Sequence, residues 1–204
     1  MKIVECIQRS PEWWLARRGV PTASDFDKIL TPKTQKASAS QEPFINQLIA
    51  ERFATVWPDE SGYVSTAMAN GTENEPIARS WYEFEHDCDV TEVGFCLSDC
   101  GRFGCSPDGL VGDEGGIELK CPSLETHVKY LREGVLPAEY RCQVHGEILV
   151  TGRAWFDFVS YAEGLPPFCI RVVPDEFTKQ LGDELSRFCD RYATELAKIE
   201  AMRS

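Results

Sequence analysis

Apolar residues recur at steps of three or four positions over several long stretches of the chain, a spacing typical of amphipathic helices. The pattern is clearest over residues 175–202, which predict a long helix. Its apolar positions are Phe177, Leu181, Leu185, Phe188, Tyr192, Leu196 and Ile199. Further helices are expected over residues 10–19, 22–30, 41–56, 66–86, 123–133 and 138–151. In the stretch 66–86, one apolar face contains Ile77, Trp81 and Phe84.

Local signals define the ends of the first helix. Ser10 is a suitable N-cap, Pro11 occupies the first helical position, and Gly19 ends the pattern. Residues 31–40 are polar and lack periodicity, so they predict a mobile loop.

The middle of the chain changes to short β-prone runs separated by glycine and aspartate. They predict a meander of strands over residues 90–98, 102–111 and 115–121, and later runs predict strands at 153–161 and 168–173. The sequence shows no internal repeat and no domain boundary. The order of elements predicts an α/β fold, with residues 1–204 forming a single domain around a central mixed β-sheet flanked by helices.

Composition and charge narrow the function classes. The formal net charge is −12, which argues against broad, nonspecific coating of DNA. A polyanionic substrate remains compatible with the chain, because a metal site or a local basic channel reverses the sign where it matters. The sequence has no run of 18 apolar residues and no secretion signal, so we expect a cytoplasmic protein without a membrane span.

Nine cysteines are dispersed along the chain without a CxxC pair. Free thiols are the expected state in a protein without a secretion signal. Cys96, Cys100 and Cys105 leave open a partial zinc or iron–sulfur set, although a fourth ligand with convincing spacing is missing.

Candidate chemistry is concentrated in the stretch CSPDGLVGDEGGIELKCPS, residues 105–123. Side chains two apart on a strand point to the same face, so Glu118 and Lys120 are expected to project together while Leu119 faces the opposite layer. The intervening turn residues allow a hairpin that brings Asp108 beside Glu118. Two carboxylates, a backbone carbonyl and waters form an oxygen-only site, which suits Mg²⁺ or Mn²⁺.

The lysine suggests the class of reaction. A lysine beside a metal ion is reasonable if an anionic substrate also binds there. Lys120 could then orient an attacking water or stabilise negative charge on a phosphate. Metal-assisted phosphodiester hydrolysis is the expected reaction. The alternative is that Glu118 and Lys120 are an ordinary surface pair on a half-exposed strand.

Several motifs together resemble a known family. PDGL…IELK resembles the PD-(D/E)xK nuclease signature, and CSPDGL…ELKCP closely resembles the bacteriophage lambda exonuclease family of YqaJ-type viral recombinases. WWLARRGVPTAS, NGTENEPIARSWYEF and YRCQVHGEILVTG are similar to three further motifs of that family, in the same order. The resemblance covers most of the chain and implies a PD-(D/E)xK nuclease core.

The resemblance assigns roles to residues at matching positions. It implies that Asp108, Glu118 and the Leu119 carbonyl hold metal ions, and that Lys120 and Glu75 are catalytic. Asp99 is a further candidate ligand, although its spacing to Asp108 is one residue shorter than in the lambda enzyme. A pocket for a terminal 5′-phosphate is implied at Arg17, Ser24, Ser106 and Gln143. Met68 matches an apolar residue that separates the two DNA strands, and His145 replaces the second glutamine of a Q-V-Q element.

The implied activity is a Mg²⁺-dependent 5′-to-3′ exonuclease, with Mn²⁺ as a substitute and two ions per active site. Its substrate would be double-stranded DNA with a 5′-phosphorylated end, yielding mononucleotides and 3′ overhangs. The family also implies a homotrimeric ring, a single-strand annealing partner, and a phage or prophage origin in a bacterial cytoplasm. The alternatives are another PD-(D/E)xK nuclease, such as a restriction-type endonuclease or an iron–sulfur enzyme, and a noncatalytic DNA-binding or assembly module.

Overall fold

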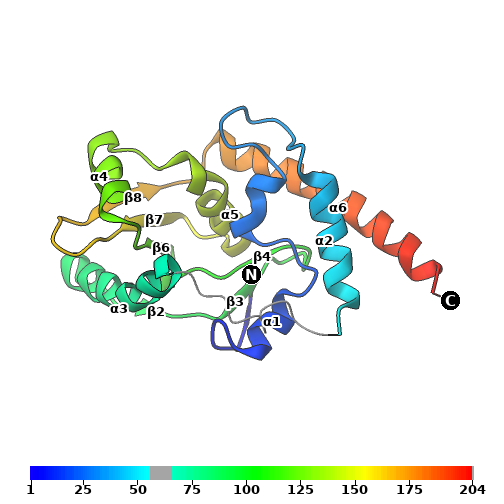
Figure 1. Cartoon of the computed structure of the whole chain (residues 1–204), viewed down its shortest axis with the longest axis horizontal. Helices are drawn as coiled ribbons and strands as arrows, with labels where there is room; N and C mark the ends of the chain where they lie inside the picture. The colour runs from blue at the N-terminus through cyan, green and yellow to red at the C-terminus, as the bar shows by residue number, and fades with distance from the viewer. Residues whose placement is uncertain (56–65, 204) are drawn as a thin grey trace.

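Two β-sheets form the frame of the computed structural model, which describes residues 1–55 and 66–203 and, for residues 66–73, only the helical backbone (Figure 1). The elements are β1 (Lys2–Val4), α1 (Pro11–Arg17), the 3₁₀ helix η1 (Ala23–Lys28), α2 (Gln41–Phe53), α3 (Thr66–His86), β2 (Val90–Thr91), β3 (Phe95–Leu97), β4 (Gly104–Cys105), β5 (Gly109–Val111), β6 (Gly115–Lys120), α4 (Leu124–Glu133), the 3₁₀ helix η3 (Ala138–Tyr140), α5 (Arg141–Thr151), β7 (Trp155–Ser160), β8 (Phe168–Val172) and α6 (Glu176–Ala201).

The larger sheet has five strands in the order β2-β5-β6-β7-β8. Strands β6 and β7 are parallel, with Glu118 opposite Phe158, whereas the other pairs are antiparallel. A parallel pair needs a long crossover connection, and α4, η3 and α5 provide it. The predicted α/β class with a central mixed sheet and flanking helices is therefore confirmed.

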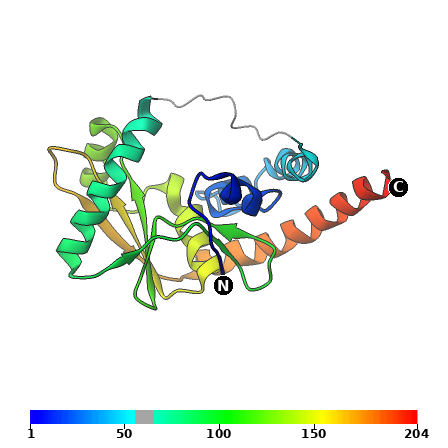
Figure 2. The same ribbon diagram turned by 90° about the horizontal axis from the view of Figure 1, so that it is seen from below.

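Helices cover both faces of this sheet (Figure 2). On one face, Ala78 and Tyr82 of α3 pack with Ile117 and Leu119 of β6. On the other face, α5 contributes to the main core together with phenylalanines of β7, and both η1 and α6 pack against α5. Successive residues of β6 therefore face different layers, as the alternation predicts.

The predicted strand meander is divided between two sheets. Strands β1, β3 and β4 form a separate three-stranded sheet, while β2 and β5 belong to the larger one. Between β2 and β3 the chain passes from one sheet to the other at Gly94, where an added Cβ would lie 2.0 Å from the Cys6 carbonyl oxygen. It passes back at Pro107, which has no amide hydrogen to donate to a ladder. A single meander was therefore the wrong expectation.

Helix boundaries differ from the predicted ones where tertiary packing decides. The stretch expected as a helix at 22–30 is a 3₁₀ helix, and the stretch at 138–151 divides into η3 and α5. On α3, Ile77 and Phe84 are 52% and 86% exposed, because Ala78 and Tyr82 face the sheet instead. The short strand β1 was not expected. The other predicted helices and strands are present with ends shifted by a few residues.

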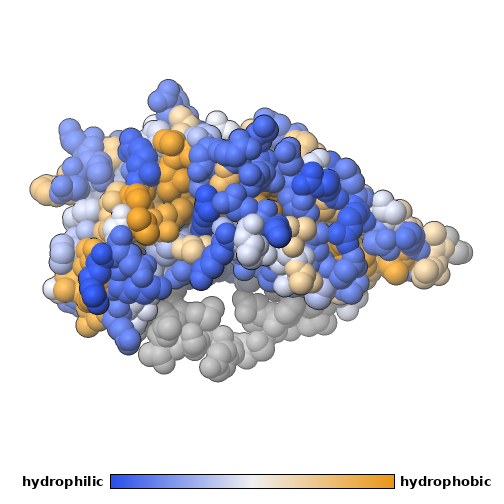
Figure 3. Space-filling view, turned by 90° about the horizontal axis from the view of Figure 1, so that it is seen from above, coloured by the Kyte–Doolittle hydropathy of each residue, from blue (hydrophilic) through white to orange (hydrophobic). Residues whose placement is uncertain are grey.

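Figure 3 shows a face that is mainly hydrophilic and is interrupted by an apolar patch. Among the described helices, none combines the length and the apolar character that a membrane crossing requires.

The close packing of η1 on α5 leads to a stability prediction. A Cβ at Gly146 would lie 2.5 Å from Cδ2 of Phe26, whose side chain is fully buried. We expect Gly146→Ala to lower the free energy of unfolding by about 1–3 kcal/mol, because the surrounding core is already filled. Denaturation with urea measures the change.

Gly182 provides a matched control inside α6. Its added Cβ would meet Leu149 at an ordinary 3.4 Å, so Gly182→Ala should raise stability by up to about 1 kcal/mol through helix propensity. Shifts of the same sign in both variants would contradict the packing explanation.

Candidate active site

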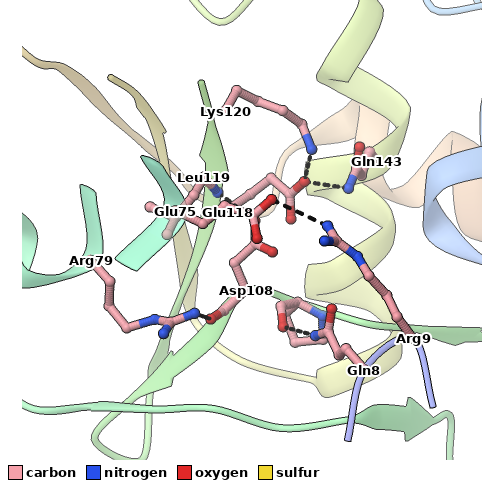
Figure 4. A network of polar contacts seen from close by, with 10 residues as sticks. Gln8, Arg9, Glu75, Arg79, Asp108, Glu118, Leu119, Lys120 and Gln143 are labelled. Carbon is pink, nitrogen blue, oxygen red and sulfur yellow. Dashed lines mark hydrogen bonds and ion pairs between the residues drawn. The ribbon is translucent and has the colours of Figure 1, made fainter. Parts of the chain in front are cut away.

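Strand β6 carries the central pair of the candidate site (Figure 4). Glu118 is 1% exposed, and Oε1 of its carboxylate accepts a short hydrogen bond from Nζ of Lys120. The two side chains lie on the face of β6 opposite to Leu119, as the strand alternation predicts. The Lys120 ammonium also lies 5.2 Å from the centre of the Tyr140 ring.

Asp108 reaches this pair from the neighbouring strand. It directly precedes β5, where Gly109 is opposite Ile117 of β6. Oδ2 of Asp108 accepts a hydrogen bond of 2.7 Å from the backbone amide of Leu119. The hairpin therefore brings Asp108 beside Glu118, as expected.

Helix α5 contributes two side chains from above the sheet. Nε2 of Gln143 donates to Oε1 of Glu118 at 2.5 Å and to Oε1 of Glu147 at 3.3 Å. Glu147 is 1% exposed and was not identified from the sequence. The available signal was its position four residues after Gln143, which places both on one helix face. Gln143 thus contacts the carboxylates in this structure.

Burial, together with the crowding of negative charge, shifts the pKa values of these groups. Burial, followed by the charge of Glu118, raises the pKa of Asp108 to about 8. The same two causes raise the pKa of Glu147 well above its usual range. Burial lowers the pKa of Lys120, but the charges of Glu118 and Asp108 outweigh it and leave that pKa raised. Lys120 is therefore a protonated hydrogen-bond donor here.

The donor set fits a hard divalent cation. Among the described residues, Oε2 of Glu118 and Oε2 of Glu147 are buried without a hydrogen-bond partner. A cation near Asp108 and Glu118 would compensate the burial of the Asp108 carboxylate and its repulsion by Glu118, the two main causes of its raised pKa. No group of three or more His, Cys, Asp or Glu side chains in the described part of the chain is arranged to hold a metal ion by itself. Any ion here therefore needs further oxygen ligands, such as a backbone carbonyl or water.

Glu75 approaches the carboxylates from α3. Its Oε1 lies 3.3 Å from Nη2 of Arg9, and its charge contributes to the raised pKa of Asp108. Arg79, one helical turn later, donates to the carbonyl oxygen of Asp108 at 3.3 Å. Neither arginine was identified from the sequence. Their roles depend on tertiary contacts of α3 with the N-terminal segment and with the start of β5, which the local pattern does not show.

A second group lies around Arg17. Its guanidinium stacks on the Trp13 ring at 4.3 Å and donates to Oγ of Ser106 at 3.2 Å and to Oγ1 of Thr22 at 3.1 Å. Ser24 joins through a 3.3 Å contact between its hydroxyl and that of Thr22. Burial lowers the pKa of Arg17. The structure thus brings together Arg17, Ser24 and Ser106 of the predicted phosphate pocket.

Other predicted residues lie elsewhere. Asp99 is not brought to the cluster: its side chain is 90% exposed and pairs with the Met1 terminal ammonium at 2.6 Å. Met68 lies on α3 among the side chains that fall outside the described residues. His145 is buried, and Nδ1 of its ring contacts Oγ1 of Thr178 at 2.8 Å.

The predicted free state of the cysteines is confirmed, because all nine are free thiols. Cys96 and Cys105 are neighbours across β3 and β4, whereas Cys100 is exposed. They form no metal-holding group in the described structure.

Comparison with protein families identifies the chain. The model of the YqaJ-like viral recombinase domain matches residues 12–154. The chain belongs to this family. The resemblance inferred from the sequence is therefore confirmed, and the matched region includes Arg17, Glu75 and all three residues of the Asp108–Glu118–Lys120 set.

Solved structures of related proteins share the fold of this YqaJ-family chain. An alkaline exonuclease from Laribacter hongkongensis is 35% identical, with a TM-score of 0.81 and coverage of 95% of this chain and 98% of that one. The same enzyme in complex with dAMP gives 36% identity and a TM-score of 0.83, with the same coverage. A phage-related exonuclease from Haemophilus somnus is 11% identical at a TM-score of 0.68, covers 88% of this chain and 96% of that one, and supports the fold alone. No curated protein matches.

Carboxylate crowding predicts how stability depends on pH. Because the pKa of Asp108 is raised to about 8, the folded protein binds more protons than the unfolded chain between about pH 4 and pH 8, so its stability falls as pH rises through this range. We expect metal-free Asp108→Asn to lose less stability over this interval. At its upper end the variant should be more stable than wild type by at least about 1 kcal/mol.

Urea unfolding across this pH range, with a chelator present, measures the effect. Asp113→Asn, in the exposed loop before β6, is the matched control and should follow the wild-type curve. Identical pH dependence in wild type and Asp108→Asn would disprove the electrostatic explanation.

Proposed function

We propose that this protein is a Mg²⁺-dependent 5′-to-3′ exonuclease that degrades one strand of double-stranded DNA. Its products would be 5′-mononucleotides and a 3′ single-stranded overhang suited to recombination by strand annealing. The observation that carries the proposal is the arrangement of Asp108, just before β5, with Glu118 and Lys120 of β6, in a YqaJ-family chain 35% identical to an alkaline exonuclease.

The arrangement of the residues suggests a role for each of them in hydrolysis. Asp108, Glu118 and the Leu119 carbonyl would hold two Mg²⁺ ions, for which Mn²⁺ could substitute. When bound, such ions activate water and neutralise charge on a phosphate. Lys120 is protonated beside Glu118, so it would orient the attacking water and stabilise negative charge on the phosphate oxygens. Glu75 would assist from α3, and Gln143 would hold Glu118 in place through its 2.5 Å hydrogen bond.

The Arg17 group suggests how the enzyme would recognise an end. A planar guanidinium with hydroxyl donors beside it suits the oxygens of a terminal phosphate. Stacking on Trp13 fixes the guanidinium, and Ser106 lies only two residues before Asp108. A 5′-phosphate bound by Arg17, Ser24 and Ser106 would place a nearby phosphodiester at the carboxylates. We include Met68 as a strand-separating contact on the strength of its matching position alone.

Assembly and location complete the proposal. Residues 1–204 would act as one nuclease domain within a homotrimeric ring, so that DNA meets a lined channel while the outer surface stays negative. A single-strand annealing protein would receive the overhang. A phage or prophage protein of this kind would work in the cytoplasm of the bacterial host. Asp99 is not retained as a ligand, because its carboxylate pairs with Met1 instead.

Digestion of end-labelled linear duplex tests the function. With Mg²⁺, we expect early release of a 5′ label as mononucleotide, persistence of a 3′ label, and no reaction in a chelator. Covalently closed circular DNA is the control substrate and should stay intact, because it has no end. Cleavage of the circle would favour the restriction-type endonuclease, and an inert enzyme on linear DNA would favour a noncatalytic module.

The Arg17 group leads to a separate prediction. Arg17→Ala should slow digestion of 5′-phosphorylated ends by about tenfold or more, because charge-assisted hydrogen bonds to the phosphate are lost. Digestion of 5′-hydroxyl ends should change little, so the preference between the two substrates should disappear. Initial rates on the two substrates measure this, with thermal denaturation as the check on folding. Equal losses on both ends would argue against a terminal phosphate pocket.

A further inference from the structure

A second cationic region lies on the Asp108 side of the candidate site. A cavity of about 330 Å³ opens there between the N-terminal segment and α3, with Arg9, Glu75, Arg79 and Asp108 among its lining residues. Figure 4 shows Arg9 and Arg79 reaching toward the carboxylates from two different sides. The roles proposed above use Glu75 and Asp108 of this lining, but neither of its two arginines.

The two arginines differ in how firmly they are held. The Arg79 side chain is 17% exposed, pairs with Glu92 at 2.6 Å and donates to the Asp108 carbonyl oxygen. These contacts fix α3 to the start of β5, so Arg79 is a positioning residue. The Arg9 side chain is 55% exposed and its ion pair with Glu75 spans 3.3 Å. An exposed pair of this kind is worth about 0–1 kcal/mol, so a DNA phosphate can compete with Glu75 for the exposed Arg9 guanidinium.

The backbone at Arg9 is strained. Its φ of 69° lies in the left-handed region, which costs a residue with a side chain about 1 kcal/mol or more relative to glycine. The preceding residue keeps the segment in place, because Nε2 of Gln8 donates to the carbonyl oxygens of Val93 and Pro107 at 3.0 and 2.9 Å. The fold would tolerate glycine better at this position, yet a guanidinium is directed there at the carboxylates.

We propose that Arg9 is a phosphate-binding residue that holds an internal phosphate of the DNA, at a position distinct from the Arg17 group. The two cations have different partners: Arg17 donates to Ser106, whereas Arg9 pairs with Glu75 of α3. Arg17 is stacked on Trp13 and would bind the terminal phosphate, whereas the Arg9 side chain is exposed and would bind a phosphate of the passing backbone. This inference rests on the proposed nuclease function.

Binding to DNA in a chelator tests the role of Arg9 without turnover. We expect Arg9→Gly to weaken binding of a linear duplex about tenfold, because one charge-assisted contact is lost. The slope of log Kd against log salt should fall by about 1. Both effects should be equal for 5′-phosphate and 5′-hydroxyl ends, unlike those of Arg17→Ala. Thermal stability should be unchanged or higher, because glycine relieves the strained φ.

Three variants serve as controls in the same fluorescence-anisotropy titration. Arg9→Lys keeps the charge and should retain most of the affinity and the salt slope. Asp87→Gly relieves another left-handed position, at φ 48°, and should bind as wild type. Arg187→Gln removes an exposed arginine of α6 and should also bind as wild type.

Two results would overturn the proposal. In the first, Arg9→Gly binds DNA with unchanged affinity and salt slope, and only its kcat for digestion is reduced. Arg9 would then be a positioning residue for Glu75. An equal loss in Arg187→Gln would reduce the effect to overall charge. Digestion by the wild-type enzyme decides the proposed function separately, because the chelator titration needs no hydrolysis.

Discussion

The burial of the Glu118 carboxylate is the constraint on which the rest of the site depends. A charge that is 1% exposed needs compensation from neighbouring groups, and here Lys120 of the same strand and Gln143 of α5 both donate to one of its oxygens. The same helix also packs closely against η1, where an added Cβ at Gly146 would lie 2.5 Å from Cδ2 of Phe26. Helix α5 therefore meets an electrostatic constraint at Gln143 and a steric one at Gly146.

Two arginines near the carboxylates, Arg17 and Arg9, differ in how their side chains are held. Arg17 is held by an aromatic ring and two hydroxyls, so its orientation is fixed before any ligand arrives. Arg9 extends from a strained segment into a half-exposed ion pair, so its guanidinium is accessible from solvent. Preorganisation suits a contact that must select one chemical group, whereas accessibility suits a contact that must accept successive equivalent groups.

Sequence patterns predicted the parts of the fold and site that depend on local periodicity. Alternation along β6 was sufficient to place Glu118 and Lys120 together, and the turn residues after Asp108 were sufficient to bring it beside them. Glu147 and Arg9 were missed because their roles depend on which face α5 presents and on where the N-terminal segment meets α3. The same limitation explains Ile77 and Phe84: periodicity identifies an apolar helix face but not the one that the sheet covers. The division of the meander between two sheets depends on close contacts at Gly94, which the local sequence does not reveal.

The crossover from β6 to β7 has a consequence for how the protein acquires its chemistry. Glu118 and Gln143 are separated by 25 positions in the chain, and the parallel pairing that unites their elements is reached only after α4, η3 and α5 have closed over the sheet. Non-local pairings of this kind are slow to form. A nascent or partly folded chain therefore keeps Gln143 and Glu147 away from Glu118, although the local hairpin can already bring Asp108 beside it. The cluster of polar side chains is complete only after α5 has closed over the sheet.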